Sequence, residues 1–282
     1  MVATGQLPIP EITARRFGAR CLPALTDDAL YERTGVRIAF TGREGGVSGA
    51  PFAELNLGNH VGDDAGAVER NRALLLEALD AADVPLVVPS QVHGDNVVEL
   101  AAASPEALAV AREAARAGAD AIVAHVARVA VLLCFADCVP VIVVSPTGRF
   151  AVAHAGWRGV ENGVAAKAVR ALVCADAAEL GERAASEYNV YVGPHIHAEC
   201  FETGFDVRKR FEDRFGSSCV PDERHVDLLE ALTLGLEEAG IDRARVADAG
   251  ICTACSSDEY FSYRASGGTC GRHGAIAFRK VR

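Results

Sequence analysis

The chain has 282 residues, of which 50% are hydrophobic and 23% are charged, and its formal net charge is −10 at pH 7. This balance is typical of a soluble globular protein and argues against a disordered or membrane-spanning chain. It also argues against general nucleic-acid binding, because neutralising a phosphate backbone requires a basic face.

The first predicted elements are a strand, a long loop and a helix. Residues 36–40 (VRIAF) predict a short strand, and the segment 41–64, rich in Gly, Asn and Asp, predicts an ordered loop. Loops of this length in compact domains are usually functional or disordered. Asp63 or Asp64 can cap a helix over residues 65–82, in which apolar residues recur at helical spacing.

The middle of the chain combines strong strand patterns with one helix. Residues 85–100 predict a strand, the polar turn SQVHG and a second strand. Residues 104–117 predict a helix, because a serine cap is followed by proline at the first helical position. The runs AVLLCF and VPVIVV predict strands on either side of Ala136-Asp137-Cys138, and RFAVAHAGWRG predicts another strand.

The second half continues the mixture of strands and helices. We expect helices near 160–173, 204–215 and 226–239, and strands at YNVYVG, at 246–251 and in the last segment, GAIAF. No internal repeat, low-complexity run or convincing linker interrupts the pattern. The sequence therefore predicts a single domain of mixed strands and helices.

The cellular location is predicted from what the chain lacks. Residues 1–20 have no apolar core of the secretory type, and the longest apolar region, 129–144, is too short to span a bilayer. We expect a cytoplasmic protein without a membrane partner. Its nine cysteines should then be mostly reduced, so that a special cysteine is a ligand or a nucleophile rather than half of a disulfide.

Three polar side chains stand at the edges of apolar strands: His93 in QVHG, Cys138 in ADC and His154 in AVAHAGWRG. Two imidazoles and one thiolate with a fourth position open make the ligand set of a catalytic zinc site. Taken singly, each residue also has a simpler interpretation, as a small buried hydrophobe or a hydrogen-bonded polar group. Asp137 favours the site, since an acid beside a buried strand is costly unless paired and so indicates a polar cavity. There it could orient a ligand, bind substrate or move a proton.

An anion pocket is predicted close to this cluster. The segment HAGWRG ends a strand and opens a helix, and helix N-termini attract anions. Arg158 could add a forked contact to phosphate, the alternative being a tight turn with Trp157 packed inside. Arg43 and Arg264 lie in similar glycine-rich settings and could complete the pocket.

Two other groups of residues could also bind a metal, but their sequence signals are weaker. Cys252 and Cys255 form a single C-x-x-C, which without a second pair is a poor zinc-finger signal, and we expect two free thiols. His195 and His197 would share a face of an extended segment. A second metal site there is the alternative to a simple pair of loop histidines.

Eight blocks of the sequence, in order, resemble the laccase-domain family, also called polyphenol oxidase-like or peptidoglycan editing factor proteins. The blocks are REGGVSGAPFAELNLGNHVGDD, SQVHGDNVV, GADAIV, FADCVPVIV, AVAHAGWRGVENGV, VGPHIHAECFETG, CTACSSDEYFSYR and GTCGRHGAIAF. The resemblance implies an α/β (α+β) fold with mixed β-sheets flanked by helices. It places one catalytic domain at residues 36–282, after an N-terminal extension of residues 1–35.

The resemblance further implies a Zn2+ ion held by His93, Cys138 and His154. It implies phosphorolysis of purine nucleosides (adenosine, inosine, guanosine and methylthioadenosine) and deamination of adenosine. The partners would be purine nucleosides and phosphate, not nucleic acid, and the protein would be a monomer or homodimer. We expect Asp137 and Cys138 to be catalytic, and we expect five residues to bind substrate: Arg43, Asn56, Gln91, Arg158 and Arg264.

Two other functions stay open at this point. A copper polyphenol oxidase is suggested by the family's older name, but type-one copper favours an axial methionine and the only methionine here is Met1. A cysteine hydrolase acting on cell-wall precursors would use Cys138 as nucleophile and a histidine as base.

Overall fold

The structure is a computed structural model that describes residues 6–280, apart from the side chains of residues 182 and 183. Its strands are β1 (Thr13–Phe17), β2 (Leu22–Thr26), β3 (Val36–Thr41), β4 (Leu86–Val87), β5 (Val97–Leu100), β6 (Ala121–Ala124), β7 (Ala130–Phe135), β8 (Val139–Val144), β9 (Phe150–Ala155), β10 (Asn189–Val192), β11 (Val246–Asp248) and β12 (His273–Arg279). Its α-helices are α1 (Asp28–Thr34), α2 (Ala65–Ala78), α3 (Pro105–Ala117), α4 (Trp157–Glu161), α5 (Val164–Leu180), α6 (Phe205–Phe215) and α7 (Leu228–Glu238). Within residues 6–280, no helix has the length and apolar character to cross a bilayer.

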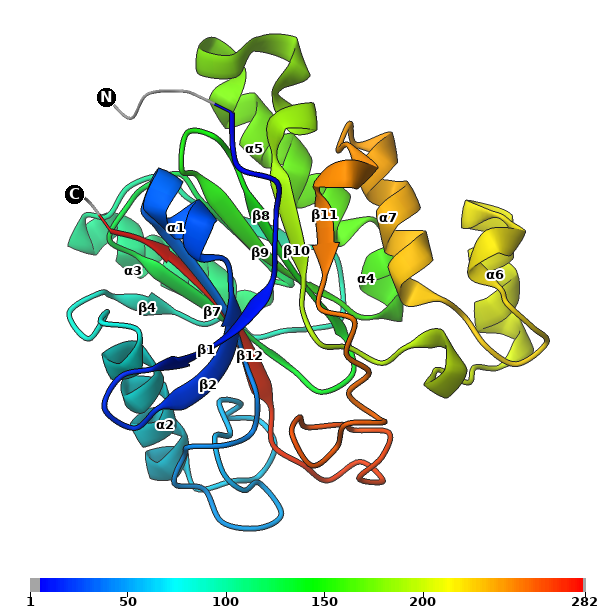
Figure 1. Cartoon of the computed structure of the whole chain (residues 1–282), viewed down its shortest axis with the longest axis horizontal. Coiled ribbons are helices and arrows are strands. Elements are labelled where there is room, and N and C mark those ends of the chain that lie inside the picture. Colours follow the sequence, from blue (N-terminus) through cyan, green and yellow to red (C-terminus); the bar gives the residue numbers. More distant parts are fainter. Residues whose placement is uncertain (1–5, 281–282) are drawn as a thin grey trace.

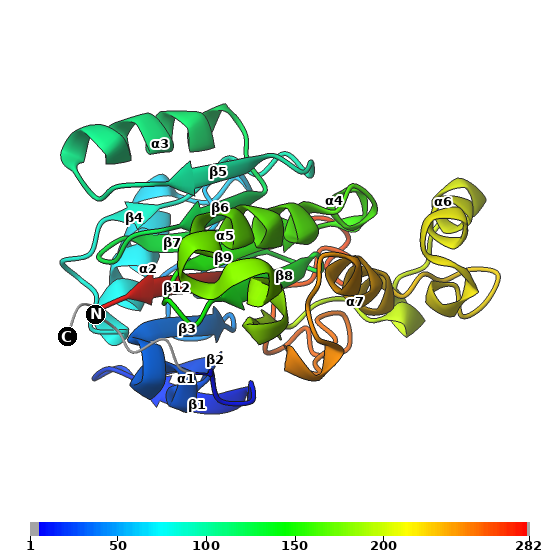
Figure 2. The same cartoon turned by 90° about the horizontal axis from the view of Figure 1, so that it is seen from above.

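The strands form two sheets of six (Figure 1). The first has the order β1-β2-β3-β12-β7-β4 and the second the order β11-β10-β8-β9-β6-β5. Most neighbours are antiparallel, but β4 pairs parallel with β7, β5 with β6, and β11 with β10. In Figure 2, α3 runs beside β5 at one end of the molecule, and β1, β2 and α1 lie at the opposite end. The predicted α/β (α+β) class, with mixed sheets flanked by helices in one domain, is confirmed.

The central strands are buried on both faces, which explains their uninterrupted apolar sequences. Val131 and Leu133 of β7 pack in the core between the two sheets, whereas Leu132 packs on the other side with Leu75 of α2. This alternation follows from the two-residue period of a strand. Helices α4, α5 and α7 cover the outer face of the second sheet in a separate apolar cluster. The layers are therefore helix, sheet, sheet and helix.

The acid and the thiol of Ala136-Asp137-Cys138 lie where the chain passes from one sheet to the other. β7 pairs with β12 and β4 in the first sheet, whereas β8 pairs with β9 and β10 in the second. The three linking residues include Asp137 with φ of 90°, a left-handed backbone that is uncommon for a residue other than glycine. The crossing point, rather than the middle of a strand, therefore carries the polar residues.

Most predicted elements are found within a few residues of their expected positions, with three differences. The helix expected near 160–173 is two helices, α4 and α5, divided by Gly163 with φ of 73°. Strand β6 was not predicted. Residues 13–34 of the expected extension form β1, β2 and α1, and β2 pairs with β3 in the first sheet. The domain boundary at residue 36 stays a prediction.

Candidate active site

His93, Cys138 and His154 converge from three segments of the chain. His93 lies in the loop between β4 and β5, Cys138 directly precedes β8, and His154 belongs to β9. Each offers one ligand atom, and the three atoms lie within 4.8 Å of one another. His154 is buried, Cys138 is half-buried and His93 is exposed, so the cluster opens to solvent on the side of His93. Such convergence is what one ion held by three side chains requires.

A buried carboxylate, Asp120, orients two of these residues. Its oxygens accept the backbone N–H groups of His93 at 3.0 Å and Gly94 at 2.7 Å. Its Oδ1 also lies 2.8 Å from Nδ1 of His154, which leaves Nε2 as the ring nitrogen available to a ligand. A carboxylate in this position fixes the tautomer and orientation of a metal-binding imidazole. Asp120 was not among the predicted residues, although it directly precedes the apolar run AIVA, and an acid beside a buried strand is the signal that singled out Asp137.

The thiol and the imidazole perturb each other's protonation. Burial raises the pKa of the Cys138 thiol, but the charge and hydrogen bonds of His154 and His93 outweigh burial and lower that pKa to about 6. Burial lowers the pKa of His154, but the Cys138 thiolate and Asp120 raise it to about 9. Each group thus favours the charged form of the other, a thiolate beside an imidazolium. A cation that binds both groups must displace the imidazole proton.

Gly156, between β9 and α4, leaves space beside the three ligands. A Cβ added at this position would lie 3.1 Å from Sγ of Cys138 and 3.3 Å from Cδ2 of His93. A side chain would therefore crowd the donor set. The space, the orienting carboxylate and the pair of imidazoles with a thiolate together fit a metal ion, and both zinc and copper accept such ligands.

Asp137 is held by the protein on both carboxylate oxygens. Thr253 donates its hydroxyl to Oδ1 at 2.7 Å, and the backbone N–H of Arg264 donates to Oδ2 at 2.7 Å. Its backbone carbonyl also accepts the N–H of Ile196. Asp137 therefore ties two distant loops to the crossing point that carries Cys138.

The predicted substrate-binding amides both make hydrogen bonds within the protein. Gln91 donates to the carbonyl of Cys134 and accepts its N–H, both at 2.8 Å, which fastens the His93 loop to β7. Asn56 is buried, and its Oδ1 accepts the N–H groups of Gly58 and Arg272. Its Nδ2 donates to a backbone carbonyl and to a nearby carboxylate. In this structure both amides support loops, and their contact with substrate stays a prediction.

The three predicted arginines differ in availability. Arg43 donates to the carbonyls of Ala53 and Ser257, and Arg264 donates to those of Cys200 and Glu202. The exposed guanidinium of Arg158 stacks on Trp157 at 4.2 Å and has no hydrogen-bond or ion-pair partner among the side chains that the structure describes. Of the three, Arg158 is therefore the one free to bind an anion.

Another histidine, His60, belongs to the surroundings of the cluster. Partial enclosure of its ring lowers the pKa of His60, and so do the charges of Arg272, His93 and His154. The sequence offered no partner for His60, because it lies in the long loop after β3 and meets the site only through the fold.

The two histidines His195 and His197 lie close together, with ring centroids 4.9 Å apart. Nδ1 of the buried His195 is 2.9 Å from the carbonyl of Gly193. Neither histidine belongs to a group of three or more candidate ligands in the part of the chain that is described. The structure therefore gives no support to a metal site at this pair.

A cavity of about 560 Å³ lies elsewhere, beside β1 and β2. Arg15, Arg16, Glu44 and Tyr260 are among its lining residues, and none of the predicted site residues lines it. We place the candidate active site at His93, Cys138 and His154, because the cavity has no comparable set of converging ligands.

The fold and the site define a class of two-sheet α/β proteins. Two histidines and a cysteine form a solvent-accessible set of candidate metal ligands near the crossing between the sheets. The chain belongs to the multi-copper polyphenol oxidoreductase laccase family, whose sequence model matches residues 37–280. The predicted resemblance to laccase-domain proteins is thus confirmed.

Individual relatives share most of their length with this chain. It is 36% identical to "Purine nucleoside phosphorylase PA4543" of Pseudomonas aeruginosa, over 86% of this chain and 93% of the relative. It is 32% identical to "Adenosine deaminase RL5" of an unknown prokaryotic organism, over 86% and 94%. The crystal structure of YlmD from Geobacillus stearothermophilus superposes with a TM-score of 0.78 at 31% identity, covering 95% of this chain and 100% of that one.

Proposed function

We propose that the protein is a zinc-dependent purine nucleoside phosphorylase that also deaminates adenosine. The observation that carries the proposal is the convergence of His93, Cys138 and His154 within 4.8 Å beside the space left by Gly156. The names of two relatives, a purine nucleoside phosphorylase and an adenosine deaminase, support the two reactions.

His93, Cys138 and His154 would hold the ion, with Asp120 fixing the ring of His154. When bound, zinc supplies Lewis acidity at its open coordination position. The lowered pKa of Cys138 favours the thiolate that would bind the ion, and His154 would bind it as a neutral imidazole. In the deamination, water adds to C6 of adenosine, the bond from C6 to the amino nitrogen breaks, and ammonia leaves with inosine as product.

In the phosphorolysis a phosphate oxygen forms a bond to C1′ of the ribose as the glycosidic bond breaks. The base leaves as the free purine, and one of its ring nitrogens takes up the proton that hydrogen phosphate loses. We assign phosphate binding to Arg158, whose guanidinium is exposed and unpaired among the described side chains. Helix α4 has only five residues, so the arginine rather than the helix terminus is the anion contact.

Asp137 would act as a positioning residue rather than by carrying a proton. Both of its oxygens already accept hydrogen bonds at 2.7 Å, and proton transfer would require one of them to break. His60 is better suited to accept a proton, because burial and the neighbouring positive charges lower its pKa and so favour the neutral imidazole.

The test is to supply inosine and phosphate to the purified protein and to measure hypoxanthine and ribose 1-phosphate by chromatography. Cys138→Ala should lose this activity and adenosine deamination together. Cys134→Ala is the matched control, since Cys134 is a buried thiol whose pKa burial raises to about 11 and whose Sγ faces Leu57. Activity retained in Cys138→Ala would refute the metal assignment.

A second candidate is a cysteine hydrolase, favoured by one observation: the lowered pKa of Cys138 beside His154 is typical of a nucleophilic thiolate. A chelator distinguishes the two. A hydrolase acting on a cell-wall peptide precursor should keep its activity after the metal is removed, whereas the phosphorylase should lose its activity and regain it with Zn2+. Recovery with copper and oxidation of a phenol would instead indicate a polyphenol oxidase.

A further inference from the structure

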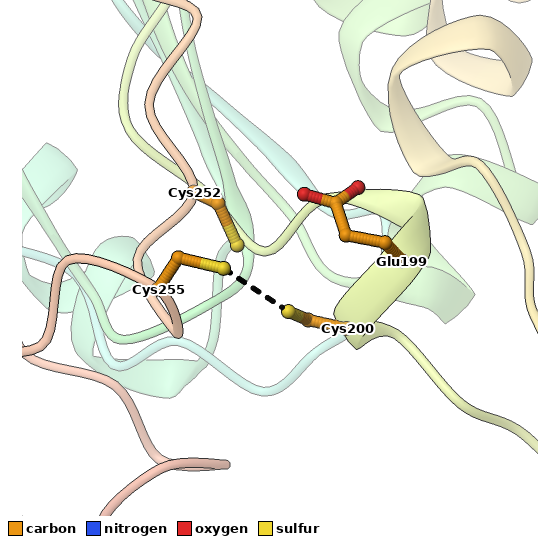
Figure 3. Close-up of side chains that lie close together, drawn as sticks. All are labelled: Glu199, Cys200, Cys252 and Cys255. Carbon is orange, nitrogen blue, oxygen red and sulfur yellow. Dashed lines mark hydrogen bonds between the residues drawn. The ribbon is translucent and has the colours of Figure 1, made fainter.

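Three cysteines outside the candidate active site bring their sulfur atoms together (Figure 3). Cys200 ends the 3₁₀ turn Ala198–Cys200, and Cys252 and Cys255 belong to the loop that follows β11. Sγ of Cys200 lies 3.4 Å from Sγ of Cys255, although these residues are 55 positions apart in the chain. With a carboxylate oxygen of Glu199, the four ligand atoms lie within 4.8 Å of one another.

The arrangement has the size of a tetrahedral zinc site. Zinc binds thiolate sulfur at about 2.3 Å, so the donors at the corners of a regular tetrahedron are separated by about 3.8 Å. The Sγ atoms of Cys200 and Cys255, 3.4 Å apart, are slightly closer than this value, and no two of the four ligand atoms are more than 4.8 Å apart. A disulfide would join only two of the three cysteines, and the third thiol would remain unbonded next to it.

The local sequence also suits a metal. Cys252 and Cys255 have the two-residue spacing that is common among zinc ligands. The N–H of His197 donates to Sγ of Cys252 at 3.4 Å. A backbone N–H that donates to this sulfur would stabilise the thiolate form, which a metal ligand requires.

The fourth donor, Glu199, has a partner of its own. Nδ1 of His197 lies 3.6 Å from Oε1 of Glu199, and Nε2 of the same ring is buried with no hydrogen-bond partner among the described residues. The imidazole of His197 therefore lies next to the Glu199 carboxylate, where it can orient the oxygen that binds the ion.

We propose that Cys200, Cys252, Cys255 and Glu199 bind a second divalent ion, zinc, which is separate from the ion of the candidate active site. Three soft sulfur ligands with one oxygen suit zinc better than a hard cation. The proposal does not depend on the proposed enzymatic function, because none of its ligands belongs to the His93, Cys138 and His154 set.

The position of this cluster gives the ion a structural role. Thr253, next to Cys252, donates to Asp137, and the guanidinium of Arg264 donates to the carbonyl of Cys200. An ion joining Cys200 to Cys252 and Cys255 would thus link the segment that accepts the Arg264 guanidinium to the loop that carries Thr253. The second ion would position the candidate active site without contacting a substrate.

The first test counts zinc per chain by elemental analysis of the full-length protein after gel filtration. Cys255→Ser should contain one zinc ion fewer than the wild type, and it should do so equally in a Cys138→Ser background. Cys174→Ser is the matched control, since Cys174 is also an exposed free thiol but lies in α5, and its zinc content should equal that of the wild type. Comparing the two backgrounds keeps this result independent of whether Cys138 binds a metal.

The second test replaces zinc by Co2+ in the Cys138→Ser protein, in which any thiolate-to-cobalt absorption must come from another site. We expect an intense near-ultraviolet band that Cys255→Ser and Cys200→Ser both weaken and Cys174→Ser leaves intact. Cys200→Ser guards against a folding defect confined to one variant. Zinc content that is the same in Cys255→Ser and wild type would overturn the proposal. An intramolecular disulfide found in the isolated protein by mass spectrometry, with no zinc at these residues, would also do so.

Discussion

Replacing Asp120 by Asn tests how far the candidate active site depends on a residue that touches no substrate. The carboxylate accepts N–H groups from the His93 loop and lies 2.8 Å from Nδ1 of His154. The amide of an asparagine keeps one acceptor oxygen but turns an NH2 group towards donors. The substitution therefore removes the negative charge and at least one charge-assisted hydrogen bond, worth about 1.5–3 kcal/mol.

This loss should appear mainly as weaker metal binding. Hydrogen bonds to a metal-ligating histidine typically change metal affinity by about 10–100-fold, which corresponds to about 1.4–2.7 kcal/mol. Asp120→Asn should thus bind Zn2+ at least about tenfold more weakly, measured by competition with a chromophoric chelator. Phosphorolysis should fall at limiting zinc and recover in excess zinc, a rescue that a purely structural defect would not show.

The matched control is Asp176→Asn. Asp176 is also fully buried and hydrogen-bonded, to Ser145, Thr147 and Tyr188, but it lies in α5 and contacts none of the three candidate ligands. It should lose stability without losing zinc affinity. If folded Asp120→Asn binds zinc as tightly as the wild type, the carboxylate supports only the backbone, and the assignment of Asp120 to the site is refuted.

Two further predictions concern acid stability and phosphate binding. Burial lowers the pKa of His273 to about 3, with Arg272 adding to the effect and the nearby Pro194 carbonyl opposing it, and neither ring nitrogen has a full hydrogen bond within residues 6–280. The unfolded chain therefore takes up the proton first, and stability falls with pH from about 6.5 towards 3, by about 2 kcal/mol at pH 5. Urea unfolding at pH 7 and pH 5 should show a smaller difference in His273→Leu, and an unchanged difference would contradict the burial argument. Arg158→Ala should raise KM for phosphate about tenfold with little change in KM for inosine, and Arg158→Lys should lie between the two; equal KM values for phosphate would exclude Arg158 from anion binding.

The strands that could be predicted are those whose buried side chains produce an apolar sequence pattern. Strands such as β7 and β8 are buried on both faces, so burial alone demands apolar residues at every position. β1 (TARRF) was missed because its charged residues face solvent and it is held by backbone pairing with β2. An edge strand of this kind needs no apolar pattern, and its sequence therefore carries little signal.

The residue types of the candidate site could be predicted, but the hydrogen bonds and contacts between its residues could not. An imidazole or a thiol at the end of an apolar run is visible in the sequence, whereas the contacts that orient it join residues far apart. Asp137 accepts from Thr253, 116 positions away, and from Arg264, 127 positions away. The C-x-x-C of Cys252 and Cys255 was recognised, but its third sulfur, Cys200, is brought to it only by the fold. Local periodicity cannot encode such pairings, because they depend on which loops the two sheets place side by side.

The crossing between the sheets explains why an aspartate precedes Cys138. The turn requires a left-handed residue there, and φ of 90° would suit glycine better than aspartate. A non-glycine residue in such a region costs about 1–3 kcal/mol, which two hydrogen bonds to its carboxylate can offset, at about 1.5–3 kcal/mol each. Glycine would relieve the strain but would release the Thr253 and Arg264 loops that those bonds hold. The aspartate therefore has two roles. Its backbone forms the turn that positions Cys138, and its carboxylate holds the loops around the candidate site.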